Sequence, residues 1–267
     1  MLRVNHLDFF YGNNHILKDI TFELKHGQSV CLLGKNGAGK STLFKNLLGI
    51  YPPSKGTIYI GNRCLSSMSR KEIAGSLSYI PQTQKSATQF TAFEMVLMGR
   101  TAKLQSYHQP GKRDDQIVEE ALDLLGISHL GNRRFCQLSG GEQQLVIIAR
   151  SVAQGSRIFI MDEPCANLDY SNQLMVLKMI RRLTDAGYLI IQATHDPNHA
   201  LQYGDQVLLL QGGEIVAQGQ PEIILTSGSL SDLYQAPIEV YSLVDERKVC
   251  MPGRSEEVRQ CGAYTTS

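Results

Sequence analysis

A run of nine residues near the N-terminus matches the pattern G-x-x-x-x-G-K-[ST] of a phosphate-binding loop. It reads Gly34-Lys35-Asn36-Gly37-Ala38-Gly39-Lys40-Ser41-Thr42. The glycines would let backbone N–H groups converge on phosphate oxygens, and a following helix would add its positive N-terminal end. Lys40 would neutralise β- and γ-phosphates, and the Ser41 hydroxyl would bind Mg²⁺. An ordinary glycine-rich turn is the alternative, but the full motif between an apolar run and a helix-like run favours phosphate binding.

Two acids follow an apolar run farther along the chain. Residues 157–161 are largely apolar and lead directly into Asp162 and Glu163. In a parallel sheet, ligands collect at the carboxyl ends of the strands, so a carboxylate there would lie beside the phosphate loop. Asp162 would then suit a Mg²⁺ shell and Glu163 would polarise an attacking water. A solvated acid after a strand is the alternative reading of Glu163.

The third motif is Leu138-Ser139-Gly140-Gly141-Glu142, which opens a helix-like run over residues 143–153. Adjacent glycines at a helix start expose N–H groups that can bind an anion. However, Ser139 with Glu142 three residues later also satisfies the capping-box pattern of an ordinary helix start. The motif alone therefore leaves both interpretations open.

The elements that would position these motifs alternate between strands and helices. Such alternation indicates an α/β fold with a mostly parallel sheet. The middle of the chain, about residues 83–156, is helical and is expected to form a subdomain inserted in that sheet. We expect strands at 3–9, 20–24, 29–33, 57–60, 157–162, 189–194, 206–210 and 215–217, and helices at 42–48, 117–125, 143–153 and 173–183. The segment 245–267 is polar and is expected to be a weakly ordered tail.

Composition bounds the possible functions. The 267 residues correspond to about 1.8 average domains. They include 26 basic and 25 acidic residues, which leave a net charge of +1 and no overall basic footprint for nucleic acid. No apolar run approaches the roughly 18 residues that would span a bilayer. The six cysteines are scattered and form no C-x-x-C pair, so a protein of a reducing compartment is expected, with no zinc site.

Taken together, these residues resemble the ATPases of ABC transporters. Leu138–Glu142 resembles their signature motif, and it precedes Asp162 as in that family. Further motifs occur in the family's order along the chain: Tyr11, Gln82 in 79–82, Asp169 in 166–169, and His195 in 194–196. The resemblance implies a P-loop NTPase fold over residues 1–244. Its parts would be a mostly parallel core sheet, an N-terminal antiparallel β subdomain and the inserted helical subdomain.

The resemblance also implies a role for each of these residues. Tyr11 would stack on adenine. Gln82 would bind Mg²⁺ or the attacking water, and His195 would contact the γ-phosphate. Asp169 would lie at a dimer interface. Each residue alone has a plainer reading: a surface aromatic, a loop glutamine, a structural histidine and a helix-start aspartate.

In this family two ATPases act as a head-to-tail pair. The resemblance therefore implies that ATP and Mg²⁺ lie between the phosphate loop of one copy and Ser139, Gly140, Gly141 and Glu142 of the other. Closure and reopening of the homodimer would drive two transmembrane permease subunits. The chain would sit at the cytoplasmic face of the inner membrane, and an extracytoplasmic substrate-binding protein would take part indirectly.

The segment Phe90–Arg100 carries a further resemblance, although core packing accounts for most of its apolar residues. It is similar to the region that follows the glutamine loop (here the loop of Gln82) in ATPases of iron-chelate and vitamin B12 importers. Residues 138–154, 194–201 and 220–234 resemble the corresponding parts of the same ATPases. A ferric siderophore is therefore the leading expected cargo, followed by haem, cobalamin and molybdate-type oxyanions. Cys165 departs from the family, which usually has Thr or Ser there, and its reactivity is left open.

Two other functions compete with an importer ATPase. The first is an ABC ATPase of DNA repair or translation. Such proteins carry two cassettes or a long coiled coil, and we find neither in this sequence. The second is a regulatory subunit that binds ATP without turnover, and the presence of both Glu163 and His195 argues against it.

Overall fold

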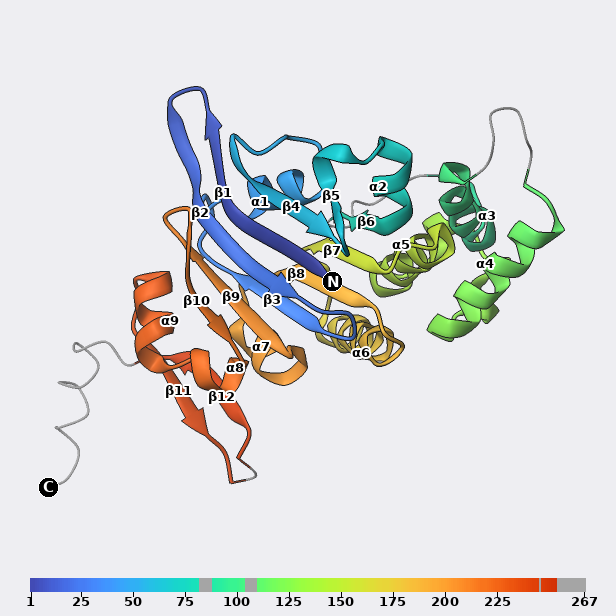
Figure 1. Cartoon of the computed structure of the whole chain (residues 1–267). Helices are drawn as coiled ribbons and strands as arrows, with labels where there is room; N and C mark the ends of the chain where they lie inside the picture. Colours follow the sequence, from blue (N-terminus) through green and yellow to red (C-terminus); the bar gives the residue numbers. More distant parts are fainter. Residues whose placement is uncertain (82–87, 104–109, 245, 254–267) are drawn as a thin grey trace, which may run out of the picture.

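The computed structural model describes residues 1–81, 88–103, 110–244 and 246–253. Its centre is a six-stranded sheet in the order β10-β9-β3-β8-β7-β6, in which all pairs of neighbouring strands are parallel except β10 and β9, which are antiparallel (Figure 1). The mostly parallel sheet predicted from the sequence is therefore confirmed. The strands are β3 (Ser29–Leu33), β6 (Leu77–Ile80), β7 (Ile158–Asp162), β8 (Leu189–Ala193), β9 (Gln206–Gln211) and β10 (Glu214–Gly219).

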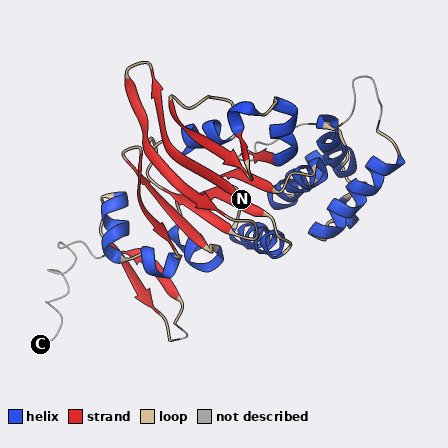
Figure 2. Cartoon of the chain, viewed as in Figure 1, coloured by secondary structure: helices blue, strands red, loops and turns tan. Residues whose placement is uncertain are grey.

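A second, antiparallel sheet formed by the N-terminal segment packs over one face of the central sheet (Figure 2). Its order is β2-β1-β4-β5, with β1 (Leu2–Tyr11), β2 (Asn14–Leu24), β4 (Lys55–Ile60) and β5 (Arg63–Cys64). Helix α1 (Lys40–Leu47) contributes Leu43, Phe44 and Leu47 to the apolar core shared by the two sheets. The predicted N-terminal antiparallel subdomain is thus present. A short 3₁₀ turn, η1 (Leu65–Ser67), and helix α2 (Arg70–Ser76) lead from it into β6.

Helices cover the opposite face of the central sheet. The chain leaves the sheet after β6 and returns at β7, the strand beside it, so the helical part is an insertion between these strands. Its helices share a second core with Phe159 and Met161 of β7 and with the long helix α6 (Tyr170–Asp185). The inserted elements are α3 (Ala92–Leu97), η2 (Met98–Ala102), α4 (Lys112–Leu125), η3 (Ser128–Leu130), η4 (Phe135–Gln137) and α5 (Gly140–Gln154).

The C-terminal part packs on the same sheet beside β9. Helix α7 (Pro197–Tyr203) follows β8, and α8 (Pro221–Ile224) and α9 (Ser227–Tyr234) follow β10. A third core joins Leu225, Leu230 and Leu233 to the inner faces of β3 and β9. The chain then forms an antiparallel hairpin of β11 (Ile238–Ser242) and β12 (Lys248–Pro252).

The hairpin differs from the expected weakly ordered tail starting at residue 245. Residues 248–252 pair with β11 throughout, and the Asn198 side chain of α7 is hydrogen-bonded to the backbone of Cys250. The hairpin pairing and the contact with Asn198 thus order a short strand inside a segment that is polar on average. Smaller differences include β6 and the helices α2, α7 and α9, which were not predicted, and α1, which begins at Lys40 rather than Thr42. In the part of the chain that the structure describes, no helix is long and apolar enough to cross a membrane.

Candidate functional site

The phosphate loop lies between the end of β3 and the start of α1. Gly39 precedes the helix with φ 109°, a conformation that side chains other than glycine rarely adopt. Gly34 approaches β9 closely, because a Cβ atom there would lie 2.4 Å from the carbonyl oxygen of Leu210. The predicted glycines are therefore required by the path of the loop.

Lys40 is folded back over this loop. Only 7% of the residue is exposed, and its ammonium donates to the carbonyl oxygens of Gly34 and, at 3.2 Å, of Lys35. Burial lowers the pKa of Lys40, while the nearby carboxylates of Glu163 and Asp162 act in the opposite direction. A partly desolvated cation in this position suits a phosphate group that supplies stronger acceptors.

A cavity of about 300 Å³ gathers most of the predicted nucleotide-binding residues. Tyr11 forms one wall, where its ring meets Phe9 edge-on at 4.9 Å and Tyr51 at 5.7 Å. Tyr11 is 42% exposed as a residue, which leaves room for a base to stack on its ring. The lining consists of Tyr11, Ile16, Lys35, Asn36, Gly37, Gly39, Lys40, Ser41, Thr42, Asp162 and Glu163. Of these, Ile16 was not predicted, because an apolar residue within a strand does not by itself indicate a nucleotide site.

The two acids lie at the carboxyl end of β7, as expected, with Asp162 as its last residue and Glu163 directly after it. Asp162 lines the cavity together with Ser41, and its carboxylate accepts a hydrogen bond from the Tyr79 hydroxyl at 3.4 Å. Burial, and then the charge of Asp162, raise the pKa of Tyr79, so this hydroxyl stays a donor. An acidic oxygen and a hydroxyl oxygen at one cavity wall are donors that fit Mg²⁺, a hard cation.

Glu163 adopts the left-handed conformation, with φ 49°, immediately after the strand. Its backbone N–H donates to the Ala193 carbonyl at the end of β8, over 3.1 Å. Such backbone costs a non-glycine residue about 1 kcal/mol or more and often marks a functional site. The turn places the carboxylate against both the nucleotide cavity and a second, smaller cavity of about 140 Å³.

His195 lies beside Glu163 in that smaller cavity. Its Nδ1 atom is 3.1 Å from Oε1 of Glu163, and 54% of the histidine side chain is exposed against 21% of the glutamate side chain. A histidine and a carboxylate in contact at the edge of a phosphate site can together hold a water molecule and its proton.

The Ser139–Glu142 motif has capping-box geometry at the start of α5. Glu142 N donates to the Ser139 hydroxyl at 3.3 Å, and Ser139 N donates to the Glu142 carboxylate at 2.7 Å. Ser139 and Gly140 are exposed. None of the four residues lines the cavity that holds the phosphate loop of the same chain. Within one copy of the chain, the phosphate loop and the Ser139–Glu142 motif therefore do not line the same cavity.

Asp169 caps α6, since its carboxylate accepts from the backbone and side-chain N–H groups of Asn172 at 2.8 and 2.9 Å. These bonds, with one from Ser171, lower the pKa of Asp169. Asn172 in turn faces the signature motif, because a Cβ on Gly141 would lie 2.3 Å from its amide oxygen. Asn172 therefore lies between Asp169 and Gly141 of the signature motif. Gln82 lies outside the described residues.

Cys165 is buried, and burial raises the pKa of its thiol to about 12. The same holds for Cys31 in β3. Neither thiol is therefore primed to react at neutral pH, and both serve as small core residues.

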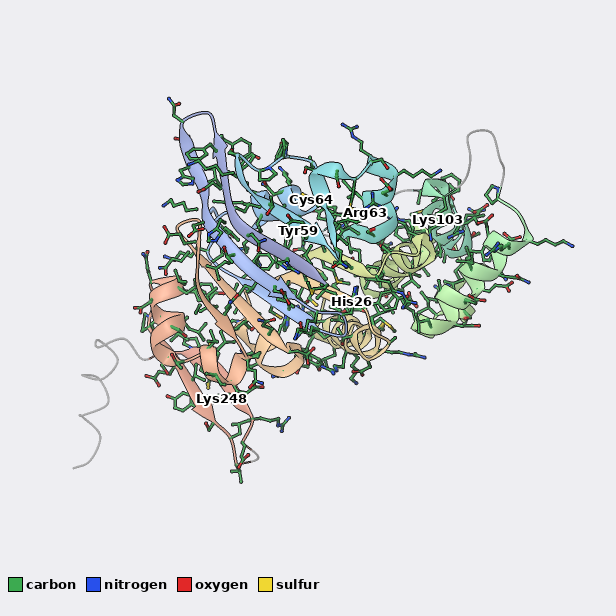
Figure 3. All side chains as sticks on the ribbon, in the orientation of Figure 1. His26, Tyr59, Arg63, Cys64, Lys103 and Lys248 are labelled. Atoms are coloured by element: carbon green, nitrogen blue, oxygen red, sulfur yellow. The ribbon has the colours of Figure 1, made fainter. Side chains whose placement is uncertain are left out.

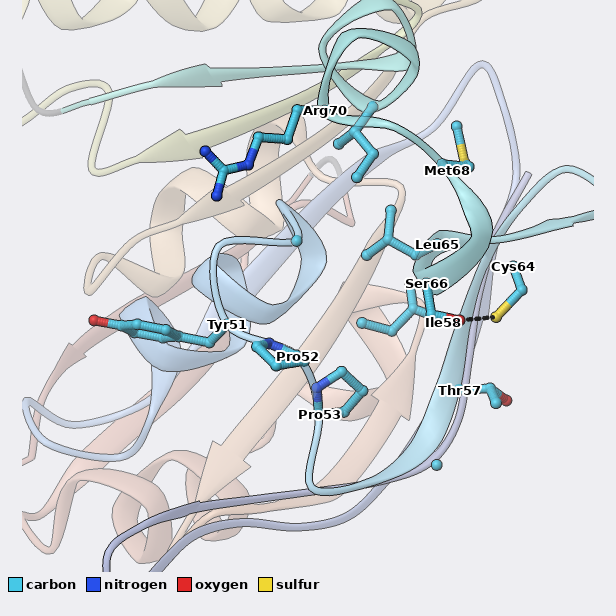
Figure 4. Close-up of a pocket in the computed structure, with 13 residues that line it drawn as sticks. Tyr51, Pro52, Pro53, Thr57, Ile58, Cys64, Leu65, Ser66, Met68 and Arg70 are labelled. Atoms are coloured by element: carbon cyan, nitrogen blue, oxygen red, sulfur yellow. Dashed lines mark hydrogen bonds between the residues drawn. The ribbon is translucent and has the colours of Figure 1, made fainter.

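A separate cavity of about 200 Å³ lies between η1 and the segment after α1 (Figure 4). Its lining is mainly apolar and includes Pro52, Pro53, Leu65 and Met68, with a Cys64–Ser66 hydrogen bond at one side. It contains none of the predicted site residues. The nucleotide cavity is instead the one that combines a phosphate loop, a cation and two acids.

A family profile described as "ABC transporter" matches residues 17–166 of this chain. An uncharacterized ABC transporter ATP-binding protein of Haemophilus influenzae is 40% identical over 90% of this chain and 91% of its own length. The hemin import ATP-binding protein HmuV of Thermobifida fusca is 35% identical over 91% and 84%. Other relatives are named for molybdate import, manganese transport and iron(3+)-hydroxamate import. Among solved structures, a chain of an ABC transporter described as of the metal-chelate type, in an inward-facing conformation, superposes with a TM-score of 0.83. It is 31% identical, over 96% of this chain and 98% of that chain.

Proposed function

The chain belongs to the ABC transporter family as an ATP-binding subunit that hydrolyses ATP, and we propose that the complex it energises imports a metal chelate. A ferric siderophore is the leading cargo, with haem, cobalamin and molybdate as alternatives. The observation that carries the proposal is the likeness, over almost the whole chain, to the metal-chelate type transporter chain. The names of relatives that import hemin and iron(3+)-hydroxamate support the same class of cargo.

Within the site, we assign hydrolysis to Glu163 and His195. The carboxylate of Glu163 would take the proton of a water molecule that attacks the γ-phosphate. The imidazole of His195, 3.1 Å away, would hold Glu163 and contact the transferred phosphoryl group. Gln82 is assigned a place in this water and metal shell from the sequence alone.

The other residues of the cavity would bind and orient the nucleotide. Tyr11 would stack on adenine, the backbone of Gly34–Thr42 would cradle the phosphates, and Lys40 would pair with the β- and γ-phosphates. Asp162, Ser41 and Gln82 would hold Mg²⁺, which when bound would neutralise part of the phosphate charge.

Since Ser139 and Gly140 are exposed and the Ser139–Glu142 helix start does not line the cavity of its own phosphate loop, we propose that it completes the site of a second copy. Asp169 would lie near that interface. Two permease subunits would anchor the homodimer at the cytoplasmic face of the inner membrane, and an extracytoplasmic binding protein would deliver the cargo. A role in DNA repair finds less support, because the longest described helix between β6 and the signature motif is α4, with 14 residues.

The test is to isolate the full complex by a tag on this chain, identify the membrane protein that accompanies it, and reconstitute both in vesicles. We expect a ferric siderophore with its binding protein to stimulate ATP hydrolysis, and a Lys40→Ala complex to show no stimulation. Stimulation by an organic solute without metal, with none by any metal chelate or oxyanion, would overturn the assigned cargo class.

A further inference from the structure

The described C-terminal residues 221–244 and 246–252, here called the brace, pack against the sheet beside β9 (Figure 1). Leu225, Leu230 and Leu233 enter a core with Cys31 and Leu33 of β3, the strand that leads into the phosphate loop. The Gln211 side chain at the end of β9 also donates to the Asp232 carbonyl of α9, at 3.1 Å. The end of α9 is thereby fixed close to the nucleotide site.

Two consecutive residues at this end reach two different loops of the site. The Tyr234 hydroxyl donates to the backbone carbonyl of His195 at 3.3 Å. The Gln235 amide oxygen accepts a hydrogen bond from the Lys35 ammonium of the phosphate loop at 2.6 Å. Gln235 adopts a left-handed conformation, φ 50°, as the residue that ends the helix. The left-handed backbone turns the chain at this position, so that Tyr234 contacts the His195 loop and Gln235 contacts the phosphate loop.

The brace is also fastened behind His195. The Asn198 amide donates to the Cys250 carbonyl at 3.2 Å and accepts from the Cys250 N–H at 2.8 Å, which copies the pairing of a strand. Asn198 lies in the first turn of α7, three residues after His195. Lys248, labelled in Figure 3, donates to the Glu222 carbonyl at 2.6 Å and joins the hairpin to α8.

We propose that the brace sets the position of the His195 loop relative to the phosphate loop, and that Tyr234 and Gln235 are positioning residues for ATP hydrolysis. Tyr234 fixes the backbone of the loop whose imidazole contacts Glu163. Gln235 holds the side chain of Lys35, and with it the open end of the phosphate loop. The proposal rests on the proposed role of His195.

The two contacts predict different kinetic changes in the full chain with Mg-ATP. Tyr234→Phe removes one hydroxyl and keeps the ring in its core, so we expect kcat to fall roughly fivefold with KM for ATP nearly unchanged. Gln235→Ala leaves Glu163 and His195 in place but lets the phosphate loop move before ATP binds. We therefore expect KM for ATP to rise about threefold with kcat nearly unchanged. Matched controls are Tyr241→Phe, in β11 of the same brace but bonded to Glu239, and Gln218→Ala, exposed on β10.

Thermal unfolding is measured for all four variants. The split between kcat and KM, at melting temperatures equal to those of the controls, supports the brace. Unchanged kinetics in both brace variants overturns the proposal. A fall in kcat together with a rise in KM in both variants, at a lower melting temperature, also overturns it, because that pattern shows a structural role only.

A His195→Ala variant separates this proposal from the one on which it rests. Slow turnover in His195→Ala with normal turnover in Tyr234→Phe overturns the brace alone. Normal turnover in His195→Ala overturns the catalytic role of His195 and the brace together. An Asn198→Ala variant provides a second route to the same loop, and we expect it to lower kcat as Tyr234→Phe does.

Discussion

The Nδ1 atom of His195 lies 3.1 Å from Oε1 of Glu163, although the two residues follow different strands of the central sheet. β7 and β8 are neighbours and run parallel, so their carboxyl ends bring the two side chains together. The contact places a group that can carry a proton beside the carboxylate proposed as the general base.

If the pair acts as a unit, its variants will not be additive. We expect Glu163→Gln to retain ATP binding and lower kcat by about 10²–10⁴-fold. Adding His195→Ala should then reduce kcat by no more than about twofold further, because the function of the unit is already lost. Steady-state hydrolysis and binding of a fluorescent ATP analogue measure both effects, with Glu119→Gln on the exposed face of α4 as control. Full turnover in Glu163→Gln would refute its assignment.

The start of α5 has an internal control for its proposed contact in trans. Ser69 and Glu72 of α2 form a capping box with nearly the same distances as Ser139 and Glu142. Each Ser→Ala change should cost about 1 kcal/mol of stability. Only Ser139→Ala should also lower ATPase activity, and the loss should persist at saturating ATP. Equal activity in the two variants would leave Ser139 as a helix cap and nothing more.

Two glycines of the phosphate loop should differ in their tolerance of alanine. At Gly34 the added Cβ would meet the Leu210 carbonyl at 2.4 Å, whereas at Gly37 there is open space and only the positive φ of 82° is costly. We expect Gly34→Ala to lose about 2–3 kcal/mol of unfolding free energy and Gly37→Ala about 1 kcal/mol. Urea denaturation measures the difference, and equal losses would contradict this geometry.

The buried thiols make stability depend on alkaline pH. Burial raises the pKa of Cys31 and Cys165 from 9.0 to about 12. The folded state therefore keeps these protons where the unfolded state releases them. The contribution of these two protonated thiols to the free energy of unfolding is complete below pH 9 and is lost as the pH rises from about 9 toward 12. Denaturation at pH 8 and pH 10 should show this loss, and a Cys31→Ala/Cys165→Ala chain should show a shallower decline.

Reactivity provides a second measurement on the same thiols. At pH 8 a thiol reagent should label the exposed Cys136 in the native chain, but Cys31 and Cys165 only after unfolding. Rapid native labelling of Cys165 would show that the turn after Glu163 opens more readily than its burial indicates.

The sequence was sufficient for those parts of the fold where one physical signal dominates. β3 is apolar from Val30 to Leu33 and fully buried, and α4 buries the apolar face that its spacing predicted. The phosphate loop, Asp162 and Glu163 were predicted because a single topology places strand ends and glycine-rich turns together.

Other parts depend on contacts between distant residues and left no local pattern. β6 has four residues and pairs with a strand 81 positions later, where Leu77 meets Ile158. β12 is held by the Asn198 side chain and by pairing with β11, neither of which its own residues indicate. No local pattern indicates what Tyr234 and Gln235 contact, since their partners, His195 and Lys35, lie 39 and 200 residues away.

The alternation of β7 between two cores has a consequence for hydrogen exchange. Ile158 and Ile160 pack under the N-terminal sheet, Phe159 and Met161 pack under the helices, and the strand has paired neighbours on both sides. Its amides cannot meet solvent through fraying of either layer alone, so they should exchange only when the whole domain opens. Asp162 is the last residue of this strand, which should be among the slowest of the chain to exchange its amides. Motions that open the surrounding loops would therefore leave the Asp162 carboxylate in place.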